Sequence, residues 1–170
     1  MSLLIRSLVA ASLLFSAACS DTGDDGLSTP RSELPAALAG DWFTGTLSSI
    51  QYYDRDTGAW QNPSGSGFYY VFGDDGAYET GAVIDSTVAG CNMRLLGNET
   101  GTVTIDGDRL TLYRHQVTVH VTSSCGNDGD RTQGEATRDL DWSVDVDTDG
   151  ITWLSLVHDD GSVERYHRWE

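Results

Sequence analysis

The sequence predicts an all-β domain, and three features of the chain support this fold class. After Leu38, no long stretch shows the 3.6-residue apolar period of an amphipathic helix. Short segments of alternating apolar and polar residues are instead separated by turns rich in Gly, Asp and Asn. The chain has 170 residues, 39% of them hydrophobic, which suits one domain with a packed core.

Strands joined in sequence order are best accommodated in a barrel, because closing the sheet removes its unpaired edges. We therefore expect a single antiparallel meander β-barrel of about 8–10 strands. A β-sandwich is the competing architecture. Residues 32–38 are the one segment of the domain with helical character, and we expect a short N-terminal helix there, at one end of the barrel.

The expected strands follow from the turn positions. They are residues 42–53, 68–72, 77–84, 102–105, 109–114, 116–123, 136–146, 151–158 and 162–169. Turns such as Asp106-Gly107 and Asp160-Gly161 favour hairpins, because Gly tolerates the positive φ that tight turns require. In residues 136–146 one face carries the apolar side chains and the other the acidic ones. The apolar face holds Leu140, Trp142, Val144 and Val146, and the acidic face holds Asp139, Asp141 and Asp145.

The first 18 residues have the three parts of a cleavable secretory signal. Arg6 supplies a positive charge, residues 8–15 form an apolar run too short to span a bilayer, and small residues follow. Cys19 comes directly after them. Two interpretations are open. Either the signal ends at a cysteine that becomes lipidated, or it is an ordinary secretory signal and Cys19 follows it by chance.

Ser16-Ala17-Ala18-Cys19 resembles the lipobox of bacterial lipoproteins, although Ser16 stands where Leu is usual. The resemblance implies that Cys19 is lipidated and becomes the mature N-terminus. Residues 19–37 then form a flexible acidic tether, and residues 38–170 form the domain. We expect an exported protein of the cell envelope, anchored by lipid to a bacterial membrane, the outer membrane being favoured.

Two further cysteines, Cys91 and Cys125, are expected to form a disulfide in an oxidising compartment. Closing the loop between them contributes up to about 3–4 kcal/mol in the loop-entropy account.

The charge and the motifs argue against several functions. The formal net charge is -16, and all ten basic residues are Arg. A polyanion repels nucleic acid, and the absence of Lys excludes Schiff-base catalysis and the phosphate-binding loop. The sequence has no Gly-x-Ser-x-Gly elbow and no zinc-type spacing of Cys and His. We therefore expect no enzyme activity and no cofactor.

Asp145, Asp147 and Asp149 have the spacing that opens a calcium-binding loop. The twelfth position, which should be a bidentate Glu, is Leu156. We expect a hairpin turn here and no metal site.

Gly40-Asp41-Trp42 at the start of the first strand, together with Arg168 in the last, resembles the pattern of bacterial lipocalin-like lipoproteins of the calycin type. In that family a Gly-x-Trp opens the barrel, and an Arg near the end of the chain packs over the indole. The resemblance covers roughly residues 38–169, and it implies a barrel with a ligand cavity.

Six aromatic residues flank the polar loop of residues 54–67 and are candidate contacts for a ligand or partner at the barrel mouth. They are Tyr52, Tyr53, Trp60, Phe68, Tyr69 and Tyr70. Packing of the loop onto the barrel rim is the alternative role for them. The sequence thus favours a non-enzymatic lipoprotein that either binds a small apolar ligand or has another role in the cell envelope. The alternative is a protein-binding module, such as an inhibitor of a basic periplasmic hydrolase (a lysozyme or a protease).

Overall fold

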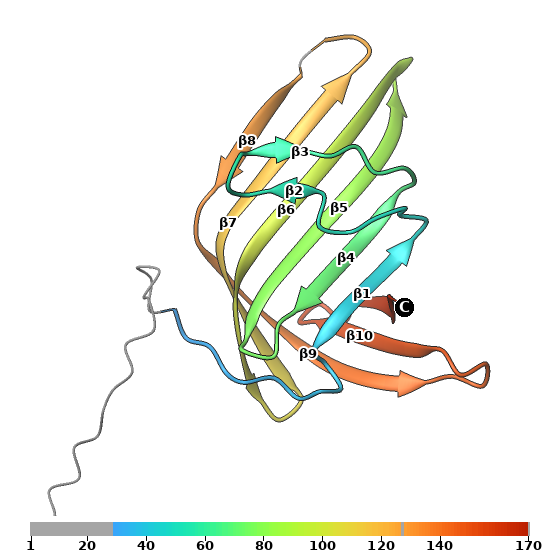
Figure 1. The fold of residues 1–170 in the computed structure, drawn as a ribbon. Coiled ribbons are helices and arrows are strands. Elements are labelled where there is room, and N and C mark those ends of the chain that lie inside the picture. The colour runs from blue at the N-terminus through green and yellow to red at the C-terminus, as the bar shows by residue number, and fades with distance from the viewer. Residues whose placement is uncertain (1–28, 127, 170) are drawn as a thin grey trace, which may run out of the picture.

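The structure is a computed structural model that describes residues 29–126 and 128–169 (Figure 1). The expected signal peptide, the lipidated Cys19 and the first part of the expected tether lie outside the described residues.

The described residues form strands throughout the domain. The strands are β1 (Gly40–Gly45), β2 (Tyr53–Asp54), β3 (Ala59–Trp60), β4 (Gly67–Phe72), β5 (Ala77–Val88), β6 (Cys91–Asp106), β7 (Arg109–Ser123), β8 (Gly129–Gln133), β9 (Ala136–Val146), β10 (Thr152–His158) and β11 (Val163–Arg168). Eight of them close into an antiparallel meander barrel, which confirms the expected fold class. This architecture is compatible with a calycin or lipocalin-like fold.

The barrel closes between its first and last strands. β1 pairs with β4 on one side and with β11 on the other, and Trp42 stands opposite both Tyr70 and Arg168. Along the rest of the wall, sequential neighbours pair from β4 to β7 and from β9 to β11, and β7 pairs directly with β9. The small strands β2, β3 and β8 are additions to this meander.

The upper part of the sheet extends beyond the closed barrel. The lower half of β7 pairs with β9, from Arg109 to Arg114, whereas its upper half pairs with β8. A register shift at Thr100/Gly101 in β6 lies between the two halves. As a result, β5, β6, β7 and β8 stand above the barrel as an open sheet (Figure 1).

Several strands differ in extent from the expectation. The first strand was expected over residues 42–53, but β1 ends at Gly45, whose φ of +97° suits glycine. The chain then leaves the barrel and returns across its outer face as the β2–β3 hairpin (Figure 1). β5 and β6 continue almost to their connection at Ala89-Gly90, where a loop was expected before residue 102.

The expected helix over residues 32–38 is wrong. The segment makes a single turn, in which the backbone N–H groups of Leu38 and Ala39 both donate to Pro35 O. Pro35 disfavours helical geometry at Leu34, the residue before it. The backbone N–H groups of this part of the segment form hydrogen bonds to the barrel instead. Ser32 N donates to Val103 O and Leu34 N donates to Asp74 O, so this segment is bound along the barrel. The described part of the expected tether, residues 29–37, therefore lies against the domain.

Gly40, Trp42 and Arg168 meet at the barrel end next to this turn. The Arg168 guanidinium carbon lies 4.4 Å from the centroid of the Trp42 ring, and the indole Nε1 donates to Leu38 O at 2.7 Å. Gly40 has a φ of +123°, and a Cβ there would lie 2.9 Å from Arg168 Nη1. The glycine of the Gly-x-Trp pattern thus makes room for the arginine, whose Nη2 also donates to Ala37 O at 2.7 Å.

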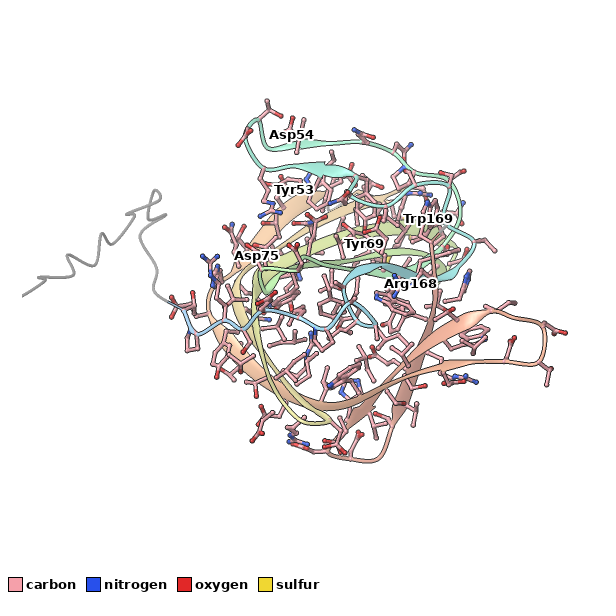
Figure 2. All side chains as sticks on the ribbon, turned by 60° about the horizontal axis from the view of Figure 1, so that its bottom comes forward. Tyr53, Asp54, Tyr69, Asp75, Arg168 and Trp169 are labelled. Atoms are coloured by element: carbon pink, nitrogen blue, oxygen red, sulfur yellow. A yellow bond between two sulfur atoms is a disulfide. The ribbon has the colours of Figure 1, made fainter. Side chains whose placement is uncertain are left out.

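The hydrophobic residues form two clusters on the two faces of the sheet. The larger cluster fills the lower barrel interior, and its fully buried members include Leu38, Trp42, Val103, Leu110, Leu112, Leu140, Leu154 and Leu156. The smaller cluster lies between the barrel wall and the segment that contains the β2–β3 hairpin. It comprises Leu47, Tyr52, Tyr69, Val83 and Leu96. In Figure 2, Tyr69 lies between the barrel and this hairpin, which carries Tyr53 and Asp54.

The disulfide between Cys91 and Cys125 is present, as expected. It joins the first residue of β6 to the turn after β7, and the two cysteines are 34 positions apart in sequence. It therefore ties together the top of the open sheet, away from the barrel core. A disulfide is consistent with an exported, non-cytoplasmic protein.

We predict that replacing both cysteines, Cys91→Ser with Cys125→Ser, lowers the free energy of unfolding by up to about 3–4 kcal/mol, because the unfolded chain regains loop entropy. Urea denaturation followed by tryptophan fluorescence measures this change. An unchanged midpoint would show that the disulfide is absent from the native protein.

Five tyrosines predict a sensitivity to alkali. Burial raises the pKa of Tyr52, Tyr69, Tyr70, Tyr78 and Tyr166, and that of Tyr70 rises to about 12. In the unfolded chain a tyrosine ionises at about pH 10. The stability that each contributes is therefore complete below about pH 10 and is lost as pH rises toward the folded-state pKa, by about 1.4 kcal/mol per pH unit.

We accordingly predict that the urea midpoint falls steeply between about pH 10 and about pH 12. Tyr70→Phe, which removes one of these ionisations, should make the fall shallower. A midpoint that is constant over this range would contradict the burial of these phenols.

Candidate functional site

The upper part of the barrel interior holds a cavity of about 270 Å³. It opens toward the extended sheet and ends below at the packed core. Its lining residues are Phe68, Tyr70, Thr80, Gly81, Ala82, Leu95, Gly97, Asn98, Glu99, Val117, Val119, Arg138, Glu164 and Tyr166.

Apolar side chains form the cavity walls. Strand pairing places Phe68 opposite Ala82, Ala82 opposite Gly97, and Gly97 opposite Val119. Gly97 leaves space at the centre of this wall, since a Cβ built on it would have no neighbour closer than 3.8 Å. The wall can therefore contact an apolar molecule along four adjacent strands.

The apolar inner surface continues above the cavity and is open to solvent. Phe68 is 44% exposed, Ile84 is 38% exposed and Met93 is 36% exposed. Large exposed hydrophobic side chains on one continuous surface mark binding sites more often than scattered ones do. This face gives the cavity room for a ligand longer than the cavity itself.

The cavity floor is a polar layer centred on Glu99. Its Oε1 accepts hydrogen bonds from Tyr78 Oη at 2.8 Å and from Arg138 Nη2 at 3.2 Å. Arg114 Nη1 lies 3.8 Å from Oε2, so two guanidinium groups flank this carboxylate. The same Arg138 nitrogen donates to Tyr70 Oη at 3.2 Å. These groups come from five strands and close the space above the core.

A second carboxylate completes the floor. Glu164 Oε2 accepts a hydrogen bond from Tyr166 Oη at 2.6 Å, and its Oε1 lies 3.0 Å from His158 Nε2. The floor thus contains two carboxylates and two guanidinium groups. Its formal charges balance, and its phenols and guanidinium groups supply several hydrogen-bond donors.

Arg138 keeps one donor unused. Its Nε is buried and has no hydrogen-bond partner among the described residues. A buried donor without an acceptor is unfavourable, by about 1–3 kcal/mol. An acceptor oxygen of a ligand that reached this N–H group would satisfy it.

The six aromatic candidates divide between the two faces of the barrel. Phe68 and Tyr70 face inward and line the cavity. Tyr69 lies between them in sequence and points outward, because successive side chains of a strand alternate. Tyr52 is buried with Tyr69 beneath the hairpin, where Tyr53 and Trp60 belong to β2 and β3.

The polar floor was not predicted from the sequence, although one signal for it was present. Arg138 lies two residues before Leu140 in β9, so the two side chains point to the same face. Arg138 is therefore a charged residue on the apolar face of this strand. Glu164 likewise lies two residues before the buried Tyr166 in β11 and points to the same face. A charge on the core-facing side of a strand indicates an internal polar network.

The acidic turn after β9 uses its central carboxylate for backbone capping. Asp147 accepts hydrogen bonds from the N–H groups of Asp149 and Ile151, each at 2.9 Å, and from Trp153 Nε1 at 2.8 Å. The hydrogen bond from Trp153 is the main cause of the lowered pKa of Asp147. Among the described residues, no three metal-ligating side chains gather in a group.

No part of residues 29–126 and 128–169 forms a helix long and apolar enough to cross a membrane. A scan of the chain against protein-family models finds no match. A search of the curated proteins also finds none.

Proposed function

We propose that this chain is a non-enzymatic, lipid-anchored lipoprotein of the cell envelope that binds a small, largely apolar ligand inside its barrel. The cavity above the packed core carries the proposal. Apolar walls would hold the hydrocarbon part of the ligand, and the polar floor would receive a hydrogen-bonding end group. The ligand is therefore amphipathic, with its polar end directed toward Arg138, Tyr70 and Tyr166.

The ligand class follows from the two kinds of surface. About 25 cal/mol is gained for each Å² of apolar surface removed from water. The walls and the exposed face around Phe68 and Ile84 offer such surface to an alkyl chain. The unused Nε of Arg138 favours an end group that has an acceptor oxygen.

The location in the envelope is supported by the signal-like first 18 residues, by Cys19 after them and by the disulfide. A protein held at a membrane by its N-terminal lipid could take up an apolar molecule close to where such molecules dissolve. The alternative, an inhibitor of a basic hydrolase, rests on the net charge of -16 alone.

Filling the cavity provides the test. We predict that a dansyl-labelled undecanoic acid binds the protein saturably and that Gly97→Leu weakens this binding about tenfold or more, since about 1.4 kcal/mol of lost contact has that effect. The new side chain would project into the cavity from a strand position where the backbone accepts a Cβ. Dansyl fluorescence during a titration measures the affinity.

Gly129→Leu is the matched control, because it adds the same side chain to an exposed strand position with nothing within 4 Å of its Cβ. Its affinity should equal that of the unaltered protein. Binding that is absent, or that is equally strong in Gly97→Leu, would refute the proposal.

A further inference from the structure

A second cavity, separate from the barrel interior, lies on the outer face of the sheet. Its volume is about 150 Å³, and residues of the β2–β3 hairpin and of the strands β6 and β7 line it. In Figure 1 the hairpin crosses the face of these strands. Its lining residues are Tyr53, Arg55, Asn98, Thr100, Gln116 and Thr118. The four that come from β6 and β7 alternate with Gly97, Val117 and Val119, which line the inner cavity, and Asn98 belongs to both linings.

The hairpin roof is held firmly on the barrel. Tyr52 Oη lies 2.6 Å from Ala82 O and 2.8 Å from Gly97 O, which anchors the start of the hairpin between β5 and β6. Trp60 stacks at 5.8 Å on His120 of β7, and this imidazole lies 2.6 Å from Asp130 of β8. The space beneath the hairpin is thus a defined part of the fold.

The polar lining of this cavity differs from the rest of the hairpin's contact surface. Beside it, the hairpin segment covers apolar residues such as Val83 and Leu96. In the cavity the barrel instead presents Asn98, which is 3% exposed, and Thr118, which is 8% exposed. Burying polar groups is unfavourable unless they are hydrogen-bonded, so packing alone would favour apolar side chains here as well.

These polar groups are only partly used within the described residues. The Asn98 carboxamide makes one hydrogen bond, from Nδ2 to Tyr69 Oη at 3.3 Å. The Gln116 carboxamide also makes one, a long bond of 3.4 Å from Nε2 to Thr118 Oγ1. Each amide therefore has an oxygen that can accept from a ligand.

The charge of the cavity is balanced. Arg55 in the roof donates to Glu79 Oε2 at 3.0 Å, and Glu79 is 6% exposed while its other oxygen accepts from Tyr69 Oη at 2.6 Å. The one guanidinium group of the lining is thus already neutralised.

We propose that this outer cavity binds a neutral, polyhydroxylated molecule the size of a single sugar ring. Carboxamides and hydroxyls can each donate and accept, which matches hydroxyl groups that do the same. The ring of Tyr53, held 4.4 Å from that of Trp60, offers a flat apolar face for the C–H groups of such a ligand. Pockets for drug-sized ligands typically have volumes of about 300 Å³ or more. The outer cavity is smaller than this, which limits its occupant to about one ring.

The experiment titrates the isotope-labelled protein with glucose, galactose and N-acetylglucosamine and records amide NMR spectra. We expect saturable shifts of the side-chain amides of Asn98 and Gln116 with at least one of the three sugars. Gln116→Ala should weaken that binding about tenfold, the equivalent of about 1.4 kcal/mol. Gln133→Ala, an exposed glutamine of the neighbouring strand β8, should leave it unchanged.

The outcomes separate this site from the barrel interior. Gly97→Leu should not alter the sugar-induced shifts, because its side chain occupies the opposite face of the sheet. The proposal is overturned if none of the three sugars produces saturable shifts, or if Gln116→Ala binds as tightly as the unaltered protein. Tighter binding of the anionic sugar glucuronate would overturn the assignment of a neutral ligand.

Discussion

The ion pair between Glu99 and Arg138 is the interaction on which the interior of this protein depends. The two side chains come from β6 and β9 and meet inside the barrel, where Tyr70 and Tyr78 share their hydrogen bonds. The Glu99 side chain is only 15% exposed, so without Arg138 its charge would have little contact with water. The pair therefore sets the height at which the packed core ends, with leucines and Trp42 below it and an open, apolar-walled cavity above it.

The strands β6 and β7 carry a different chemistry on each face. Gly97, Val117 and Val119 face the inner cavity, whereas Asn98, Gln116 and Thr118 face the hairpin. Strand alternation makes this division possible without extra structure. It requires only that the outer face be covered, and the β2–β3 hairpin covers it. The hairpin is thus explained as the roof of a polar cavity as well as the cover of Tyr69 and Val83.

Much of the fold could be predicted from local patterns. The alternation of apolar and polar residues predicted β9 at its observed bounds, and Gly-containing turns predicted the main hairpins. Cys91 and Cys125 are the two cysteines that remain beside Cys19, so their disulfide could be predicted as well. The errors arose where tertiary contacts override local signals. Residues 46–53 look like a continuing strand, but the positive φ at Gly45 turns the chain away, and Tyr52 is buried against the outer wall. The helix-like residues 32–38 are instead used for backbone hydrogen bonds to the barrel rim.

The candidate sites were less predictable than the fold. Aromatic content drew attention to the right region, yet it could not show that Phe68 and Tyr70 lie inside while Tyr69 lies outside. The floor of the inner cavity joins residues that are far apart in sequence, such as Tyr70 and Arg138, and only barrel closure brings them together. The same holds for the outer cavity, because the path of the hairpin has no local sequence signal.

The division of the interior can be measured directly by methyl NMR during a titration with decanoic acid. The account predicts shifts for the methyl groups of Leu95, Val117 and Val119 in the cavity walls, and none for those of Leu112, Leu140 and Leu154 in the core below the Glu99–Arg138 pair. Shifts spread evenly through both sets, or confined to the lower set, would contradict it.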